Sequence, residues 1–550
     1  MAQELDPIQT GASTAGLTGT LNGAEQDVLK FGGQQLTIGK DSLVIVDNAA
    51  QKKKNRTCGF GSASDPGSRS IPLYNILWAS LSDDSRTLTI DFAEPASKTR
   101  LRPATLTYTL PEAPEPEPEQ QLSTAETRAA WVEALLDRSY GPAARRKRAY
   151  VLVNPHAGPG GADKKYEQQA RPIFEAARMH LDTVTTTHSG AAVELCRDMD
   201  VDAYDVVVAC SGDGLPHECF NGLGQRADAR RALAKIAVCH VPCGSGNAMA
   251  CNLYGTHKPS LAALAIVKGA PTPMDLVSIT QAGRPRLLSF LSQALGIVAE
   301  ADLATEHLRW MGGARFTWGF LERFLAKKVY PCDLAVKVEI EHKDGVRQHY
   351  SARQRGDSST SALGAAGKSS SVLAGDTTSE DATSSAAAAP GASEEGLPPL
   401  RYGTVEDKLP EGWEMVPHDK MGNFYCGNMA YMAPDANFFS AACINDGLMD
   451  LVTIDGDLPP LKSLQLLLSV EDGRFFDNPL VQYRKITGFR IVPRDQADGY
   501  ISIDGERVPF APFQAEVHQG LGTVLSKRGE YEAPGPRNWD RVSATDRFMA

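Results

Sequence analysis

The chain has 550 residues and a formal net charge of −11, and 42% of its residues are hydrophobic. An acidic balance argues against a general nucleic-acid binder, because such proteins need a basic excess to contact phosphates. No apolar run approaches the ~18–20 residues that span a bilayer, no secretory signal is visible, and the 10 cysteines suggest neither a disulfide framework nor a zinc site. We therefore expect a soluble, cytoplasmic protein of two or more domains.

The N-terminal part, residues 1–110, is expected to form a β-rich module of unknown role. Strand-like runs at 36–38 and 86–91 alternate there with polar breaks. Residues 111–147 are interpreted as a linker and a helix: Pro and Glu first alternate, as in a stiff charged linker, and helical spacing follows at 124–138.

Residues 148–280 alternate short apolar runs with helical segments. This pattern predicts an α/β domain with a largely parallel sheet. The expected strands are 149–153, 206–209 and 236–241, and the expected helices are 166–179 and 260–268.

Residues 281–530 are richer in strands and predict a β-dominated domain, followed by a tail at 531–550. A segment of Ser, Ala, Thr and Gly at 358–396 has almost no large apolar residue, so we expect a disordered insertion there. The expected strands are 334–340, 448–454, 486–492 and 499–503, and a helix is expected at 461–470 after two prolines.

Glycine loops follow all three expected strands of the α/β domain. The first runs from Asn154 to Gly161 and the third from Cys243 to Ala248. Glycines let backbone N–H groups turn toward a ligand, so we expect these loops to hold phosphate, with Asn247 capping the next helix or contacting the nucleotide. Each loop alone is also compatible with an ordinary strand-to-helix turn.

The second loop reads Ser211-Gly212-Asp213-Gly214-Leu215, with Glu218 five residues after the aspartate. An acid at the end of such a strand lies in the crevice where open α/β sheets bind ligands. Asp213 can accept a proton there or hold a water on a metal. A turn aspartate and a helix-cap glutamate are the alternative. The sequence contains no phosphate loop of the GxxxxGK[ST] type, no GxGxxG after a strand and no protein-kinase signature.

The three loops together resemble the diacylglycerol-kinase catalytic family and, within it, the sphingosine (sphingoid long-chain base) kinases. Ser211 supports the narrower resemblance, because diacylglycerol kinases usually have Gly there. The resemblance covers about 148–350 and 400–525, and it is carried by Asn154-Pro155, Ser211 to Leu215, Asn221-Gly222, Pro242 to Ala248, Met274 to Leu276, Ala301 to Leu303, Asp446 to Leu451 and Ile503 to Glu506.

This resemblance implies an α/β nucleotide-binding domain followed by a β-rich, β-sandwich-like lipid-binding domain. It implies transfer of phosphate from ATP, with Mg²⁺, to the primary hydroxyl of a sphingoid base, with Asp213 as the base and Glu218 in support. Asp302 would pair with the substrate amine, since a lone buried charge is costly. Asp504 and Glu506 would hold the metal. The residues implied for the nucleotide are Asn154, Pro155, Gly158, Gly160, Thr186, Ser211, Gly212, Gly214, Gly244, Ser245, Gly246, Asn247, Arg309, Arg315, Asp504, Gly505 and Glu506.

Several alternatives stay open. Arg309 and Arg315 are also compatible with surface arginines, and Asp302 with a solvated helix acid. Ala191 stands where the family often has His, and Pro159 where it often has Lys. A diacylglycerol or ceramide kinase, an NAD kinase, and a lipid- and nucleotide-sensing adaptor without activity are the competing functions.

A lipid substrate implies peripheral contact with intracellular or plasma membranes, and a homodimer is left open. A basic run at 52–56 precedes Cys58, which raises the hypothesis of an electrostatic patch with a palmitoylated cysteine. A solvated basic loop is the alternative.

Overall fold

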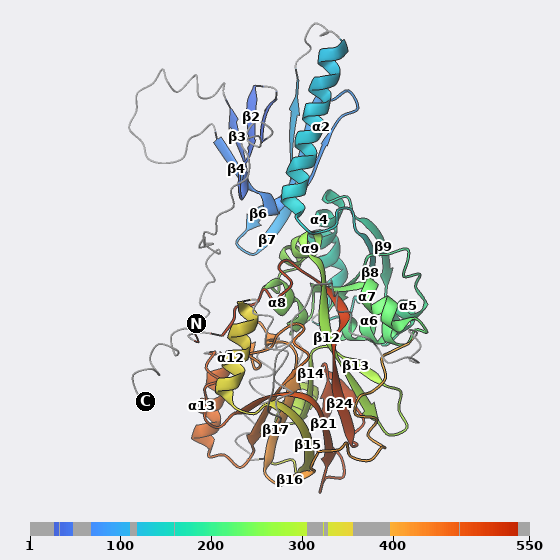
Figure 1. Ribbon diagram of the computed structural model, residues 1–550, viewed down its shortest axis with the longest axis vertical. Coiled ribbons are helices and arrows are strands. Elements are labelled where there is room, and N and C mark those ends of the chain that lie inside the picture. Colours follow the sequence, from blue (N-terminus) through green and yellow to red (C-terminus); the bar gives the residue numbers. More distant parts are fainter. Residues whose placement is uncertain are drawn as a thin grey trace, which may run out of the picture. The chain divides into compact units, whose positions relative to one another are not determined.

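A computed structural model describes residues 27–31, 33–47, 68–110, 118–158, 160–304, 323, 328–355, 396–471, 473–536 and 539 (Figure 1). The chain divides into two compact units, Met1–Phe92 with Thr105–Gly141 and Ala93–Ala104 with Pro142–Ala550. The basic run at 52–56, Cys58, Arg309, Arg315 and, apart from Gly396, the insertion expected at 358–396 lie outside the described residues.

The first unit contains two antiparallel sheets and a helix. Trp131 is buried in this unit, and its indole N–H donates to the Asp27 carbonyl at 3.3 Å. The elements are β1 (Val28–Phe31), β2 (Gln34–Ile38), β3 (Ser42–Asp47) and β4 (Ser68–Pro72), then η1 (Leu73–Asn75), β5 (Ile76–Leu81), β6 (Thr87–Ser97), β7 (Arg100–Thr109) and α2 (Pro118–Tyr140). The end of β6 and the start of β7, within Ala93–Ala104, belong to the second unit.

The α/β part of the second unit has four parallel strands in the order β11-β10-β8-β9. Every residue of β10 and β11 is buried, which explains their largely apolar sequences. The strands are β8 (Arg148–Val153), β9 (His180–Thr185), β10 (Val206–Ser211) and β11 (Ala237–Pro242). The helices are α3 (Ala162–Lys165), η2 (Tyr166–Ala170), α4 (Arg171–Ala176), α5 (Ala191–Asp198), α6 (Gly214–Gly224), α7 (Ala229–Lys235), α8 (Ala248–Tyr254) and α9 (Pro259–Lys268).

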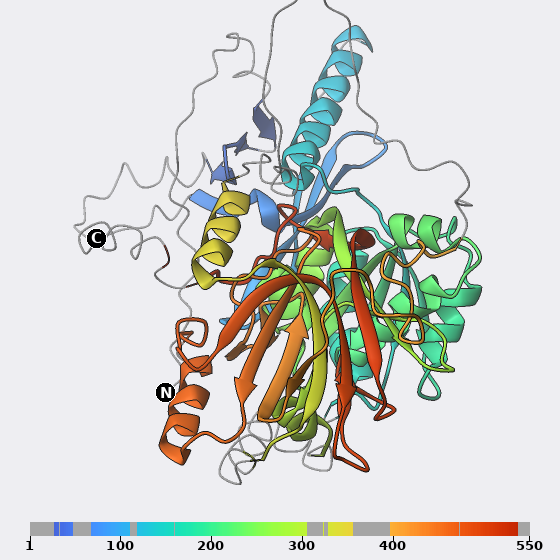
Figure 2. The ribbon, with the colours of Figure 1, turned by 60° about the horizontal axis from the view of Figure 1, so that its bottom comes forward.

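The remainder of this unit is β-rich, as expected, and Figure 2 shows its strands side by side. The strands are β12 (Ala270–Gln281), β13 (Leu287–Ser289), β14 (Ser292–Gly296), β15 (Cys332–Ile340), β16 (Val416–His418), β17 (Met421–Gly427), β18 (Tyr431–Ala433), β19 (Ala436–Asn437), β20 (Met449–Asp455), β21 (Gln482–Pro493), β22 (Ile501–Ile503), β23 (Glu506–Val508) and β24 (Phe513–Ser526). The helices are α10 (Ile297–Ala304), α12 (Lys343–Gln354) and α13 (Pro460–Glu471).

One mixed sheet of 15 strands connects the α/β and β-rich parts. Its last strand, β24, pairs antiparallel with β12 from Ala270↔Ser526 to Gln281↔Phe513, and it also pairs parallel with β11. The domain limit expected at residue 280 therefore falls inside a continuous sheet. The α/β fold with a β-rich C-terminal region is confirmed, while the exact domain limits stay a prediction. No helix among the described residues is both long and apolar enough to cross a membrane.

Candidate active site

A cleft of about 510 Å³ lies at the carboxyl ends of β8, β10 and β11, where it is closed by α10, α13 and the β22–β23 turn. This is the edge at which parallel sheets bind ligands. The residues expected there that line it are Asn154, Gly158, Thr186, Ser211, Gly212, Asp213, Gly214, Glu218, Gly244, Ser245, Gly246, Asp302, Asp504, Gly505 and Glu506. Pro155, Gly160 and Asn247 are described but do not line the cleft.

The three glycine loops pack directly against one another. A Cβ on Gly158 would lie 3.0 Å from the Cα of Gly244, and a Cβ on Gly244 would lie 2.4 Å from the Cα of Gly212. Gly158 also has a φ of +56°, which side chains rarely adopt. The glycines are therefore needed for the loops to meet, in addition to the phosphate contacts expected from the sequence.

The third loop keeps two backbone donors available. The Gly244 amide donates to the Ser211 carbonyl and to Asn247 Oδ1, and Asn247 Nδ2 returns a bond to the Gly244 carbonyl, so Asn247 closes the loop on itself. Within the described part of the chain, the amides of Ser245 and Gly246 donate to no group. Both residues line the cleft, so these N–H groups can bind an anion there.

Asp213 is held rigidly at the start of α6. Its Oδ2 accepts the Ala248 amide at 2.9 Å and its Oδ1 accepts the Met249 amide at 3.0 Å. The side chain is 14% exposed. Because a carboxylate offers about four lone-pair sites, each oxygen can still accept a hydrogen from a substrate hydroxyl.

His240 lies behind Asp213 and was not expected from the sequence. Its ring is fully buried, and Nε2 donates to the Ser211 carbonyl at 2.9 Å. Nδ1 lies 3.8 Å from Asp213 Oδ1 and has no hydrogen-bond partner in the described structure. Burial lowers the pKa of His240, so the imidazole is neutral near pH 7. A buried strand position gives no local sign of this role.

Two further side chains of α6 position the cleft. Glu218 Oε2 accepts the Ala192 amide at the start of α5, at 3.1 Å. Asn221 donates to the Leu288 carbonyl at 2.8 Å and accepts the Leu288 amide at 2.9 Å, which joins α6 to β13. Glu218 lines the cleft, and its bond to Ala192 fixes the carboxylate there. Asn221 connects the α/β part to the β-rich part through its two bonds to Leu288.

Asp504 is a buried anchor rather than an open ligand. Its carboxylate accepts five hydrogen bonds, which exceeds the roughly four lone-pair sites available, so no room remains for a metal ion. This crowding speaks against the metal role expected for Asp504. The donors are His217 Nδ1, Ser289 Oγ and the amides of Phe290, Leu291 and Ser292. Although burial favours the neutral ring, the hydrogen bond and charge of Asp504 raise the pKa of His217.

Two other acids, Glu506 of β23 and Asp302 of α10, lie in the cleft at the β22–β23 turn. Asp504 and Gly505 have φ values of 53° and 86°, which form the tight turn. Beyond it, Glu506 Oε1 would lie 2.7 Å from a Cβ on Gly214, so this carboxylate faces the start of α6. Asp302 Oδ2 would lie 3.7 Å from a Cβ on Gly505. Asp302 and Glu506 therefore meet at one turn although about 200 residues separate them in the sequence.

Comparison with known proteins agrees with this geometry. Residues 148–279 match the diacylglycerol kinase catalytic domain, and residues 27–141 match a domain of unknown function. The chain is 31% identical over 462 residues to sphingoid long chain base kinase 4 of Schizosaccharomyces pombe, covering 83% of this chain and 88% of that protein. The chain belongs to the sphingoid long chain base kinase family.

Other members of the family are also similar. Identity is 34% over 429 residues with sphingoid long chain base kinase 5 of Saccharomyces cerevisiae, covering 73% of this chain and 62% of that protein. The match thus spans less than two thirds of that relative's length. Identity is 27% over 396 residues with human sphingosine kinase 1, covering 69% and 91% of the two chains. A kinase family implies ATP as the phosphoryl donor.

In this sphingoid long chain base kinase family member, the far end of the cleft is apolar. It is lined by Val298, Phe438 and Val470, which belong to one hydrophobic cluster, and by Leu467 of the same helix as Val470. Leu291 also lines the cleft, but it packs in the cluster that contains Leu215. The sequence predicts the helix that carries Leu467 and Val470, but it does not predict that this helix forms a wall of the cleft.

Lys165 is a second residue missed from the sequence. Its Nζ donates to the Cys243 carbonyl at 3.0 Å, directly beneath the third loop. In the sequence, Lys165 follows by six residues the position where the family often has Lys, and its cation contacts the third loop.

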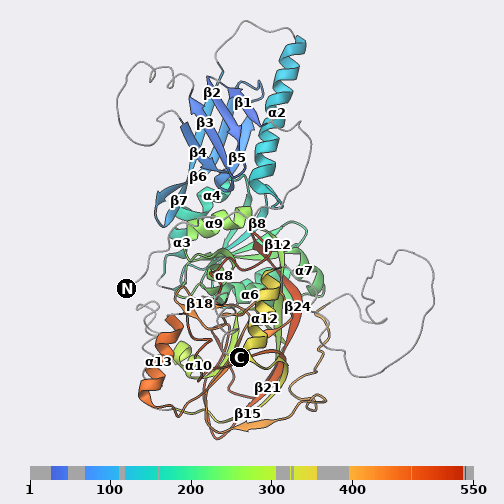
Figure 3. The ribbon, with the colours of Figure 1, turned by 60° about the vertical axis from the view of Figure 1, so that its left-hand side comes forward.

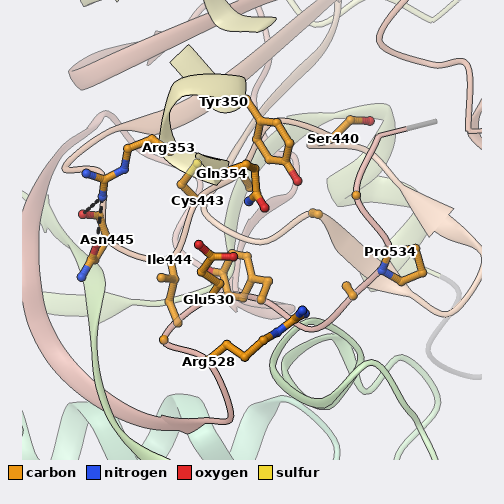
Figure 4. Close-up of a pocket in the computed structure, with 16 residues that line it drawn as sticks. Tyr350, Arg353, Gln354, Ser440, Cys443, Ile444, Asn445, Arg528, Glu530 and Pro534 are labelled. Carbon is orange, nitrogen blue, oxygen red and sulfur yellow. Dashed lines mark hydrogen bonds between the residues drawn. The ribbon is translucent and has the colours of Figure 1, made fainter. Parts of the chain in front are cut away.

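A separate cavity of about 330 Å³ shares no residue with the cleft. Figure 4 shows Tyr350, Gln354 and Glu530 directed into it. Beside it, ligand atoms of His349, Cys443 and Asp446 lie within 4.8 Å of one another. Lys485 Nζ, however, lies 2.8 Å from Asp446 Oδ2 and already provides the positive charge, so this group needs no metal.

Proposed function

We propose that this protein transfers the γ-phosphate of ATP to the primary hydroxyl of a sphingoid long chain base, such as sphingosine, dihydrosphingosine or phytosphingosine. One observation carries the proposal: a single cleft joins a polar end, built from three glycine loops and Asp213, to an apolar end that suits an alkyl chain. Membership in the sphingoid long chain base kinase family supports the choice of substrate.

The polar end suits phosphoryl transfer, which depends on positioning and charge neutralisation more than on covalent chemistry. In the proposal the Ser245 and Gly246 amides hold nucleotide phosphates. Asp213 accepts the proton of the attacking hydroxyl, and its two bonds to the α8 amides fix the direction of that approach. Arg309 and Arg315 remain proposed phosphate contacts.

The metal is proposed to be Mg²⁺, which neutralises phosphate charge when it is bound and prefers hard oxygen ligands. Of the two acids expected to hold it, Glu506 suits this role because its carboxylate faces the cleft near Gly214. Asp504 does not, because its oxygens are already occupied by five donors.

Asp302 is proposed to pair with the substrate amine. It is partly buried in the cleft, where an ammonium group needs a carboxylate partner. A lipid substrate also implies that a cytoplasmic enzyme visits intracellular or plasma membranes peripherally. A homodimer stays a prediction.

The test is a radiolabelled-ATP assay with sphingosine, dihydrosphingosine, phytosphingosine, ceramide and diacylglycerol. We expect the Asp213→Asn variant to lose about 10²–10⁴-fold in kcat while retaining nucleotide binding. Asp435→Asn is the matched control, since Asp435 lines the same cleft without an assigned role. Near-normal turnover of Asp213→Asn would refute the mechanism.

The lipid panel also decides between the competing functions. Preference for ceramide or diacylglycerol would replace the proposed substrate. Nucleotide binding without transfer to any of the five lipids would favour a sensing adaptor. Asp302→Asn should raise the KM for sphingoid bases and leave the KM for ATP unchanged, whereas equal changes in both would reject the amine contact.

A further inference from the structure

Helix α13 exposes an unusual number of apolar side chains. Among the described residues, five large hydrophobic side chains are exposed, and three of them lie on this helix: Leu461 at 68%, Leu464 at 41% and Leu468 at 50%. Their spacing of three and four residues places them on one face. The other two, Val28 and Val416, lie on separate strands.

The opposite face of α13 belongs to the cleft. Leu466 and Val470 are buried in a cluster that contains Val298 of α10, and Figure 3 shows α13 beside α10. Leu467 and Val470 line the apolar end of the cleft. The helix is therefore a wall with apolar side chains on both sides, whereas a helix on the surface of a soluble protein normally turns polar residues outward.

The charges and length of α13 favour a bilayer as the partner of its outward face. Residues 460–470 contain no acidic residue, and the one acid of the helix is its last residue, Glu471. Lys462 and Gln465 are the exposed polar residues among the leucines. Lys462 can contact anionic headgroups, and no acid among the three leucines would repel them. With 12 residues the helix is too short to span a membrane, so it would lie in the interface.

We propose that the outward face of α13, formed by Leu461, Leu464 and Leu468, docks on a lipid bilayer. Docking would place the apolar wall of the cleft against the membrane, and an alkyl chain would then pass from the bilayer to the cleft without crossing water. The inference rests on the proposed function for the nature of this alkyl chain, whereas the docking itself requires no turnover.

Vesicle co-sedimentation of the full chain tests this surface. The vesicles contain phosphatidylcholine with phosphatidylserine, and the variant replaces all three leucines by Gln. We expect at least about 10-fold weaker vesicle binding, because the apolar area inserted by three leucines is lost. Val416→Gln is the matched control, since Val416 is 44% exposed on β16 away from α13, and it should bind normally. Unchanged binding of the triple variant would overturn the proposal.

Activity measurements separate docking from catalysis. With substrate in vesicles, kcat/KM of the triple variant should fall in parallel with binding. With a short-chain sphingoid base dissolved as a monomer, it should stay within about 2-fold of the wild type, because none of the three leucines lines the cleft. A fall of equal size in both assays would instead assign these leucines to the cleft.

Two further outcomes are decisive. If light scattering shows a wild-type dimer that the triple variant converts to a monomer with unchanged vesicle binding, the face binds a second copy and the proposal fails. If the wild type phosphorylates no sphingoid base but still binds vesicles through the leucines, docking stands and the proposed function fails. A normal thermal unfolding curve of the variant, or of Leu461→Gln alone, confirms that folding is intact.

Discussion

Replacing Asp504 by Asn distinguishes an anchor from a metal ligand. The substitution keeps the size of the side chain and one acceptor oxygen but turns the other oxygen into an NH₂ group, which cannot accept a hydrogen bond. If the amide nitrogen faces His217 and the Phe290 amide, both of these buried donors lose their acceptor.

The expected cost is large. Hydrogen bonds to a charged group contribute about 1.5–3 kcal/mol each, so losing two lowers the free energy of unfolding by roughly 3–6 kcal/mol. Total stabilities are typically about 5–15 kcal/mol, so the denaturation midpoint should shift strongly. The separate loss of one donor in Ser289→Ala should cost about half as much, about 1.5–3 kcal/mol.

Urea unfolding followed by tryptophan fluorescence measures this effect, and a magnesium titration of activity measures the metal requirement. Glu506→Gln is the contrasting variant from the same hairpin: we expect normal stability and a raised magnesium requirement. Should Asp504→Asn fail to fold, Ser289→Ala still reports on the anchor. A variant of Asp504 with a normal midpoint and a raised magnesium requirement would refute the anchor role.

Two other predictions concern the loops and the pH dependence of stability. Gly244→Ala would place a Cβ 2.4 Å from the Cα of Gly212, so the loops must separate, and we expect kcat/KM to fall about 100-fold with an unchanged circular dichroism spectrum; near-normal kinetics would contradict the close packing. Burial and the Asp446 carboxylate raise the pKa of Asp275 to about 8. The unfolded value is about 3.9, so between these values the folded state keeps a proton that the unfolded state has lost, and this contribution to stability declines as pH rises from about 4 to 8. In the wild type this group alone lowers the free energy of unfolding by about 1.4 kcal/mol per pH unit, and Asp275→Asn should remove that decrease. Urea unfolding of both proteins at pH 5 and pH 7 measures it, and equal pH dependence of the wild type and the variant would contradict the prediction.

Local patterns were sufficient to predict the glycine-loop side of the cleft. The strands expected at 149–153, 206–209 and 236–241 lie within or overlap β8, β10 and β11, because a continuous apolar run and the glycine loop after it are properties of adjacent residues. The position of Asp213 at the end of β10 follows from the same pattern. The prediction of a helix at 166–179 was less accurate, because this segment is divided into η2 and α4 and its helical part ends at Ala176.

The roles of Asp504 and Glu506 could not be separated in this way. They are two residues apart in one short motif, yet the donors to Asp504 come from residues 217 and 289–292, the first of them 287 positions away. Only the folded hairpin, with its left-handed turn, buries the first acid and directs the second to the cleft.

By itself, the sequence determined that an α/β sheet carries three glycine loops with Asp213 among them, because buried apolar runs, loop glycines and their order are properties of neighbouring residues. The tertiary structure decided that β24 returns to complete this sheet, that Asp504 is saturated, and that α13 is a wall with leucines on both sides. These features depend on contacts between distant residues, and periodicity along one helix cannot tell which of its faces the rest of the chain will cover.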